Sequence, residues 1–137
     1  MTGPVVAYID GGARGNPGPA GFGVRLEQAD GTLIEELCES IGVATNNVAE
    51  YRALIAALEW VHGRGGRSVR VRSDSLLLVQ QMRGNYRVKN AGLRPLHARA
   101  TLLAMEIGGV TYEHVGRELN EHADRLANTA MDEAAQA

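Results

Sequence analysis

The sequence has little cysteine and few large aromatic side chains, with one Cys, one Phe and one Trp among its 137 residues. The single cysteine, Cys38, excludes an internal disulfide framework and cannot build a cysteine zinc site alone, which favours a reducing compartment. No apolar run approaches the roughly 18 residues of a membrane span. A signal peptide is not expected, because Asp10 and two glycines interrupt the apolar start. We therefore expect a cytoplasmic protein without a membrane partner.

The composition predicts one folded domain. Hydrophobic residues make up 45% of the chain and charged residues 22%, so the chain can bury a core and wholesale disorder is excluded. No repeat, linker or low-complexity tract divides it. We expect a single domain over residues 1–137, present as a monomer, with a small and polar tail at 132–137 that frays.

Charge is distributed unevenly, although Lys and Arg total 14 and Asp and Glu total 16. Eight basic residues fall between Arg64 and Arg94, where Asp74 is the one acid. A basic stretch in a near-neutral domain favours a polyanionic partner, and a solvated arginine face explains it equally well.

Hydrophobic periodicity predicts five strands and four helices. An Asp-Gly hairpin signal at 29–31 joins the second strand to the third, so the first three strands are expected to be antiparallel. The pattern indicates an α/β fold with a mixed five-stranded sheet and helices on both faces. The expected strands are 5–9, 22–27, 32–40, 68–73 and 110–115, and the expected helices are 47–62, 75–82, 95–107 and 120–131.

Four carboxylates fall where these elements begin or end. Asp10 and Asp74 follow strands, and Glu50 and Asp124 lie in first helical turns. Because strand ends and helix starts meet at the crevice of an α/β sheet, all four are expected to converge there. Packed together they would repel one another unless a hard cation such as Mg²⁺ neutralised them.

Each acid also has a purely local explanation. Glu50 completes a capping box with Asn47, Asp74 caps the helix from Ser75, and Asp124 favours its helix dipole. Asp10 has no such explanation, and local roles do not account for all four together.

The glycine-rich segment 12–18 is neither a dinucleotide fingerprint nor a P-loop, because the glycine spacing is wrong and a strand follows it. A segment of this kind can bring backbone amides close to sugar and phosphate groups.

Four motifs together resemble those of type 1 ribonuclease H. They are DGGARGNPGPAGFG at 10–23, TNNVAE at 45–50, SDS at 73–75 and NEHADRLA at 120–127. Their order and spacing match along essentially the whole chain. The chain is most similar to the compact bacterial and archaeal branch, which includes actinobacterial domains fused to a C-terminal phosphatase, so such a partner domain is expected.

The resemblance implies a ribonuclease H-like fold and hydrolysis of the RNA strand of RNA/DNA hybrids to 5′-phosphate and 3′-hydroxyl ends. It implies that Asp10, Glu50, Asp74 and Asp124 hold two Mg²⁺ ions, with Mn²⁺ as a possible substitute. By matched position, the hybrid is contacted by Gly11, Gly12, Arg14, Asn16, Thr45, Asn46 and Asn47. Phosphate contacts are further expected from Arg72, Arg83, Arg87 or Lys89.

The chain departs from many relatives before the last helix. The segment at 113–120 is shorter than the loop that carries an auxiliary histidine in those proteins. His114 matches by counting back from Asp124, whereas Arg117 follows the Val-Pro-Arg pattern of the compact branch with Gly116 in place of proline. We favour Arg117 as an auxiliary catalytic residue. A lysine-rich protrusion after Met82 is also missing, which predicts weaker substrate binding.

Two other functions remain open at this point. One is a DNA-cutting exonuclease or resolvase of the wider superfamily, which the Asn46–Asn47 pair argues against because reading a 2′-hydroxyl is useless on DNA. The other is a non-catalytic nucleic-acid-binding module, which usually lacks one or more of the acids.

Overall fold

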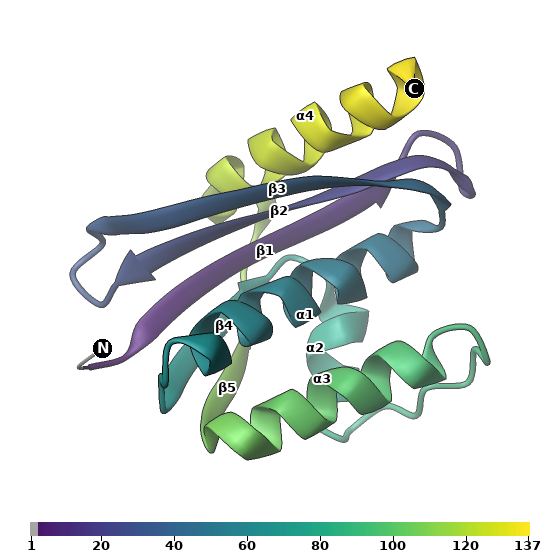
Figure 1. The fold of residues 1–137 in the computed structure, drawn as a ribbon. Coiled ribbons are helices and arrows are strands. Elements are labelled where there is room, and N and C mark those ends of the chain that lie inside the picture. Colours follow the sequence, from purple (N-terminus) through teal and green to yellow (C-terminus); the bar gives the residue numbers. More distant parts are fainter. Residues whose placement is uncertain (1–2) are drawn as a thin grey trace.

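A computed structural model describes residues 3–137 as a five-stranded sheet with helices on both faces (Figure 1). The strands lie in the order β3-β2-β1-β4-β5. The β1–β2 and β2–β3 pairs are antiparallel, whereas the β1–β4 and β4–β5 pairs are parallel. The predicted mixed sheet is confirmed. Its strands are β1 Val5–Ala13, β2 Gly18–Gln28, β3 Leu33–Ala44, β4 Ser68–Ser73 and β5 Gly109–His114.

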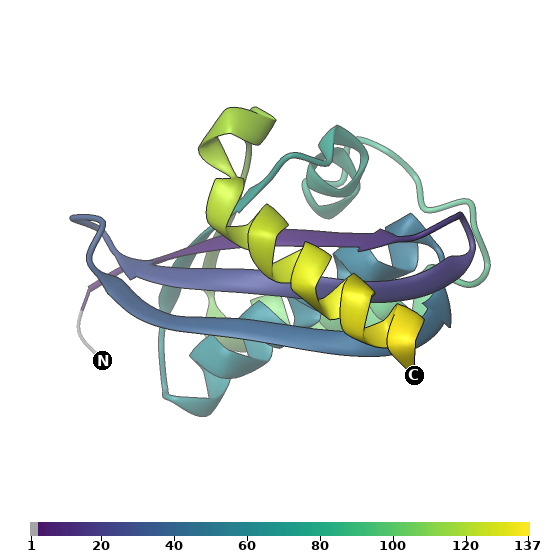
Figure 2. The same ribbon diagram turned by 90° about the horizontal axis from the view of Figure 1, so that it is seen from above.

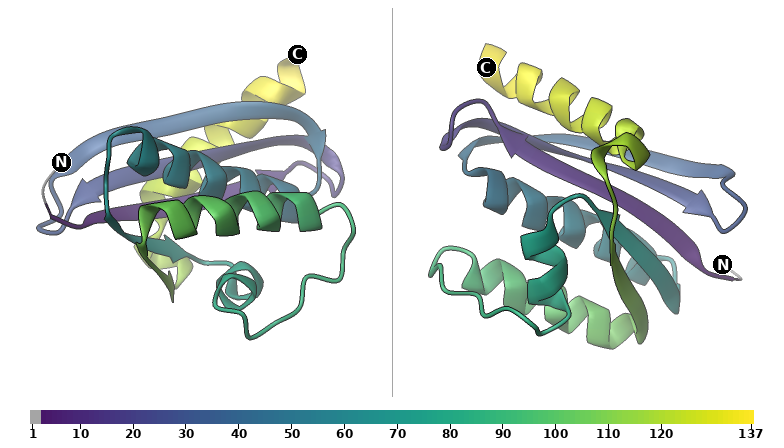
Figure 3. Two further views of the ribbon diagram at one scale, coloured as in Figure 1. Left: turned by 60° about the horizontal axis from the view of Figure 1, so that its bottom comes forward. Right: turned by 180° about the vertical axis from the view of Figure 1, so that it is seen from behind.

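The helices lie on opposite faces of the sheet, as expected. Helices α1 and α3 pack side by side on one face, and α4 crosses the other face over β1 to β3 (Figures 1 and 2). A long connection from α2 to α3 runs outside these layers (Figure 3). Within residues 3–137 no helix has the length and apolar character to cross a membrane. The helices are α1 Asn46–Gly63, α2 Leu76–Met82, α3 Arg94–Ile107 and α4 Glu121–Gln136, with a short 3-10 turn, η1, at Arg117–Leu119.

The main core lies between α1 and the sheet. Alternate residues of β1 and β4 point into it, including Ala7, Ile9 and Val71, all of which are fully buried. The predicted inward face of α1 is confirmed, since each of its members is buried: Tyr51, Leu54, Ile55, Leu58 and Val61.

Helix α4 lies close to β2 because glycine faces it. A Cβ atom added at Gly23 would lie 2.4 Å from Cβ of Leu126, so a side chain there would push the helix away. The predicted inward residues of α4 are buried: Ala123, Leu126, Ala127, Ala130 and Met131. The helix continues to Gln136, so it includes residues 132–136 of the segment that was expected to fray.

Several expected boundaries were wrong. Strand β2 begins at Gly18, four residues earlier than expected, and β3 ends at Ala44, four residues later. Two further differences affect the site. Strand β1 does not end before Asp10 but continues to Ala13, because its pairing with β2 outlasts its pairing with β4. Helix α1 begins at Asn46 with Thr45 as its cap, and the Thr45 hydroxyl accepts a hydrogen bond from the Val48 N–H at 3.2 Å. Glu50 therefore lies beyond the first turn and does not form a capping box.

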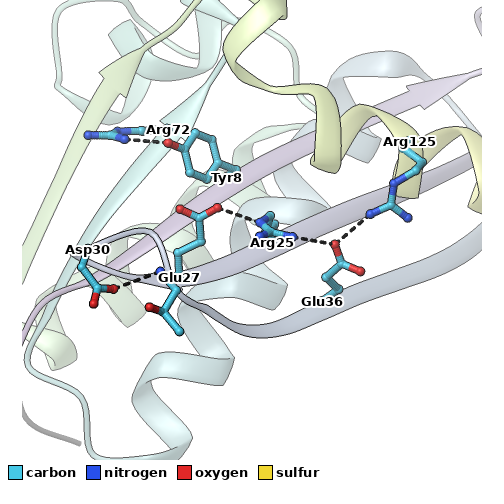
Figure 4. A network of polar contacts seen from close by, with 8 residues as sticks. Tyr8, Arg25, Glu27, Asp30, Glu36, Arg72 and Arg125 are labelled. Atoms are coloured by element: carbon cyan, nitrogen blue, oxygen red, sulfur yellow. Dashed lines mark hydrogen bonds and ion pairs between the residues drawn. The ribbon is translucent and has the colours of Figure 1, made fainter.

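A row of polar side chains crosses the α4 face of the sheet (Figure 4). Arg25 donates to Glu27 at 2.7 Å and to Glu36 at 3.2 Å, and Glu36 also accepts from Arg125 of α4 at 2.8 Å. Farther along the row, Arg72 donates to the Tyr8 hydroxyl at 2.7 Å (Figure 4). Each carboxylate in this row has a cationic partner.

Candidate active site

Three carboxylates converge where β1 and β4 separate. The pairing of these strands ends at Ile9 and Ser73, and each is followed directly by an acid, Asp10 and Asp74. Glu50 comes from the second turn of α1. One oxygen atom of each acid lies within 4.8 Å of the other two. These three acids meet as the sequence predicts, and the fourth, Asp124, lines the same cleft.

Glycine allows α1 to approach this point. A Cβ atom added at Gly11 would lie 2.3 Å from the carbonyl carbon of Ala49, which is closer than packed atoms come. The Gly11 N–H donates to Oε1 of Glu50 at 3.3 Å. Glu50 is thus bound to β1 and held beside Asp10, so its local explanation as a helix cap was wrong.

Burial and like charge disfavour ionisation of this cluster. Burial, followed by the charges of Asp74 and Asp124, raises the pKa of Asp10 from 3.8 to about 7. Burial, with Asp10 and then Asp74, also raises the pKa of Glu50 well above its usual range. No Lys or Arg forms an ion pair with these two acids among residues 3–137.

The cluster suits a divalent cation. Oε2 of Glu50 is buried and has no hydrogen-bond partner among the described residues. A buried carboxylate oxygen without a partner is costly. An all-oxygen donor set from converging carboxylates is what Mg²⁺ binds, and its charge would relieve the repulsion. Asp10, Glu50 and Asp74 therefore fit the metal that the sequence predicts.

Asp124 lies at the rim of the same cleft. It is exposed on α4 and does not belong to the group of three, but its charge contributes to the raised pKa of Asp10. The cleft has a volume of about 480 Å³. It is lined by predicted residues and by four that the prediction missed: Ala13, Ser75, Asn128 and Met131. Of these, Asn128 was open to prediction, because it lies four residues after Asp124 on the same helix face.

One member of the asparagine pair, Asn46, is oriented by the glycine-rich segment. Asn16 Oδ1 accepts the Asn46 N–H at 3.0 Å, and Asn46 Oδ1 accepts the Ala13 N–H at 2.8 Å. With its oxygen engaged in this way, Asn46 has its NH₂ group left for a ligand in the cleft.

Other predicted contact residues make bonds within the protein. The Arg14 guanidinium donates to Asn128 at 3.1 Å and to Asp132 at 2.8 Å, which ties the segment to α4. Thr45 caps α1, and Asn16 does not line the cleft. Gly11, Gly12 and Arg14 line it.

Comparison with known proteins decides the family. A family model described as reverse transcriptase-like matches residues 8–130. Ribonuclease H of Phenylobacterium zucineum is 35% identical, over all of this chain and 96% of that protein. The chain belongs to the ribonuclease H family.

Two further relatives agree with this assignment. Bifunctional protein Rv2228c of Mycobacterium tuberculosis is 50% identical over 96% of this chain, which spans only 36% of that protein. The solved N-terminal RNase H domain of Rv2228c matches with a TM-score of 0.95 and 48% identity over 98% of each chain. LC11-RNase H1, solved in complex with RNA/DNA hybrid, matches with a TM-score of 0.90 and 44% identity, over 95% of this chain and 98% of that one.

The two candidates for the auxiliary residue of this ribonuclease H domain lie in different places. Arg117 begins η1 and lines the acidic cleft. His114 ends β5 outside the cleft lining, and its Nε2 atom lies 3.3 Å from the Asp74 carbonyl oxygen. This placement supports Arg117.

A second groove, of about 500 Å³, adjoins the cleft at Asn47. It is bounded by α2 and by the connection from α2 to α3, which carries Arg87 and Lys89 (Figure 3). Neither of these two residues forms an ion pair within the described chain. By contrast, Arg72 is bound to Tyr8, and Arg83 donates to the Tyr112 carbonyl. Only part of the basic stretch is therefore available to a ligand.

Proposed function

We propose that this chain hydrolyses the RNA strand of RNA/DNA hybrids and leaves 5′-phosphate and 3′-hydroxyl ends. The observation that carries the proposal is the acidic cluster. Within the described part of the chain, its three carboxylates share a site without an ion-pair partner, and one buried Glu50 oxygen has no hydrogen bond. Such a cluster is poorly suited to structural support and well suited to holding cations at a phosphate.

The metal in this proposal is Mg²⁺, with two ions per site and Mn²⁺ as a possible substitute. Asp10, Glu50 and Asp74 hold the ions, and Asp124 completes the set from the rim. When bound, the ions activate a water molecule and stabilise the leaving 3′ oxygen. The protein holds the carboxylates apart at fixed positions, through the Gly11–Glu50 bond and the ends of β1 and β4.

Hybrid recognition in this proposal uses the cleft and the adjoining groove. The NH₂ group of Asn46 and the side chain of Asn47 donate to ribose 2′-oxygens, which distinguish RNA from DNA. Arg117 faces the negative charge of the phosphate being cut, and Arg87 and Lys89 contact phosphates of the other strand. The solved complex of LC11-RNase H1 with RNA/DNA hybrid supports this choice of substrate.

The presence of a second domain in the protein stays a prediction. The name of the bifunctional relative supports a second domain in the complete protein, for which we retain the phosphatase expectation. The cytoplasmic location, the monomeric state and the choice of Mg²⁺ are likewise predictions.

The test compares four substrates of identical sequence: RNA/DNA hybrid, double-stranded RNA, double-stranded DNA and single-stranded RNA. With Mg²⁺ we expect internal cleavage of the hybrid's RNA strand only, and no cleavage in EDTA. Cleavage of DNA alone would reassign the chain to a DNA nuclease. Hybrid binding without any cleavage would make it a binding module.

A further inference from the structure

Asn120 occupies an unusual position between η1 and α4. It is 1% exposed, and although it precedes α4 its side chain does not cap that helix. Its Nδ2 atom instead donates to the Ile9 carbonyl oxygen at 2.9 Å, across 111 residues of sequence. Burial shields this bond from water, so it restrains two distant segments of the chain.

The partner of Asn120 is the last β1 residue before the acidic cluster. Strand β4 pairs with β1 as far as Ile9 and Ser73 and then leaves the sheet. Asn120 binds the Ile9 carbonyl where β4 no longer continues, immediately before Asp10. The position of the Asp10 backbone is therefore fixed partly by a side chain from the other end of the sequence.

The backbone of Asn120 reaches two more residues of the cleft. Its carbonyl oxygen accepts the Asp124 N–H at 3.0 Å, and its own N–H donates to the Arg117 carbonyl at 2.9 Å. Asn120 is therefore bonded to Asp124, to Arg117 and to Ile9, the residue directly before Asp10.

Other side chains tether α4 to the sheet, away from the acidic cluster. Ser40 of β3 donates to the Ala130 carbonyl at 2.6 Å, and Cys38 donates to the Leu126 carbonyl at 3.0 Å. These bonds hold the body of the helix on a strand that carries none of the four acids. Ser40 thus provides a matched control for the role of Asn120.

We propose that Asn120 is a positioning residue that sets the separation of Asp10 and Asp124, and through it the affinity of the site for divalent cations. The proposal rests on the proposed function and adds to it a residue that touches neither metal nor substrate. Partners behind metal ligands typically change metal affinity or activity by roughly 10- to 100-fold when they are removed.

The experiment compares the wild type with Asn120→Ala, Asn120→Asp and the control Ser40→Ala. Asn120→Asp keeps the size of the side chain and removes the donor. Denaturant unfolding first establishes that each variant is folded. Calorimetric titration with Mg²⁺ then gives the metal affinity, and steady-state cleavage of hybrid at saturating Mg²⁺ gives kcat and KM.

We expect both Asn120 variants to bind Mg²⁺ at least tenfold more weakly and to lose kcat by a similar factor with KM within about threefold of the wild type. We expect Ser40→Ala to keep the wild-type metal affinity despite its lower stability. Metal affinity that is unchanged in folded Asn120 variants, or that falls equally in Ser40→Ala, overturns the proposal.

A measurement on the wild type covers the case in which the Asn120 variants do not fold. The side-chain amide signals of Asn120 in a ¹⁵N NMR spectrum should shift on addition of Mg²⁺, whereas those of Asn85, which bonds Gln80 away from the acids, should not. An unmoved Asn120 signal contradicts the proposal. A wild type that binds Mg²⁺ but does not cut hybrid refutes the proposed function, while the titration still decides the role of Asn120.

Discussion

The acidic cleft and the polar row on the α4 face differ in whether their carboxylates form ion pairs within the protein. In the row, Arg25 lies between Glu27 and Glu36, and Arg125 adds a further cation (Figure 4). In the cleft, Asp10, Glu50 and Asp74 meet without an ion pair to any cation among residues 3–137. Half-buried charges that serve the fold are paired, whereas those in the cleft leave the positive charge to be supplied from solution.

The largest effect is expected from Asp74→Asn. This change removes one ligand charge from the cleft and preserves the size of the side chain, so we expect hybrid cleavage to fall by on the order of 10³-fold while the fold is kept. Cleavage rates and circular dichroism measure the two effects. A rate within tenfold of the wild type would mean that Asp74 does not hold the metal.

A stabilising effect is expected from Asp10→Asn in the absence of divalent cations. The pKa of Asp10 is raised from 3.8 to about 7 in the folded protein, so the buried charge destabilises the fold above pH 7 and this cost disappears as the pH falls below about 4. In EDTA at pH 8 we expect the free energy of unfolding to rise by on the order of 2 kcal/mol, with no gain at pH 3. Urea unfolding at both values checks this.

Asp30 is a control for the urea unfolding experiment, because its pKa is lowered whereas that of Asp10 is raised. Its carboxylate accepts the Thr32 N–H at 3.0 Å in the β2–β3 hairpin, and this bond lowers its pKa (Figure 4). Asp30→Asn should therefore lose stability at neutral pH and not gain it. If Asp10→Asn and Asp30→Asn both raised the free energy of unfolding, the gain would reflect the loss of one negative charge from the molecule and not the burial of Asp10 in the cleft.

Removal of a charge from the polar row should lower the free energy of unfolding, in contrast to Asp10→Asn. Arg25→Met leaves Glu27 and Glu36 without their shared cation in a partly buried setting, and we expect a loss of about 1–2 kcal/mol in the free energy of unfolding. Hybrid cleavage per folded molecule should not change. Addition of Mg²⁺ should stabilise the wild type and this variant by the same amount, because both keep the cleft, so the difference between them should persist.

The smallest effect is expected from Lys89→Ala in the second groove. Loss of one phosphate contact should weaken hybrid binding a few-fold and reduce the slope of log affinity against log salt by about one. Fluorescence anisotropy in Ca²⁺ over a range of salt concentrations measures both. An unchanged slope would show that the Lys89 side chain does not reach the duplex.

The sequence predicted the fold and most of the cleft because those signals are local. Strand β4 was predicted to the residue, since alternating valines end at an acid, and the inward face of α4 followed from its period. The cap of α1 was mistaken, because Asn47 and Glu50 fit a capping box equally well and only contact with Gly11 decides between the two readings. The bond from Asn120 to Ile9 joins residues too far apart for any local pattern to reveal.

The most direct test of the central claim is anomalous diffraction from crystals of the protein soaked in Mn²⁺. We expect an anomalous peak enclosed by the carboxylates of Asp10, Glu50 and Asp74, and none along the row from Tyr8 to Arg125. A structure at high Mn²⁺ concentration with no peak at the three acids, or with its strongest peak elsewhere, would contradict the account.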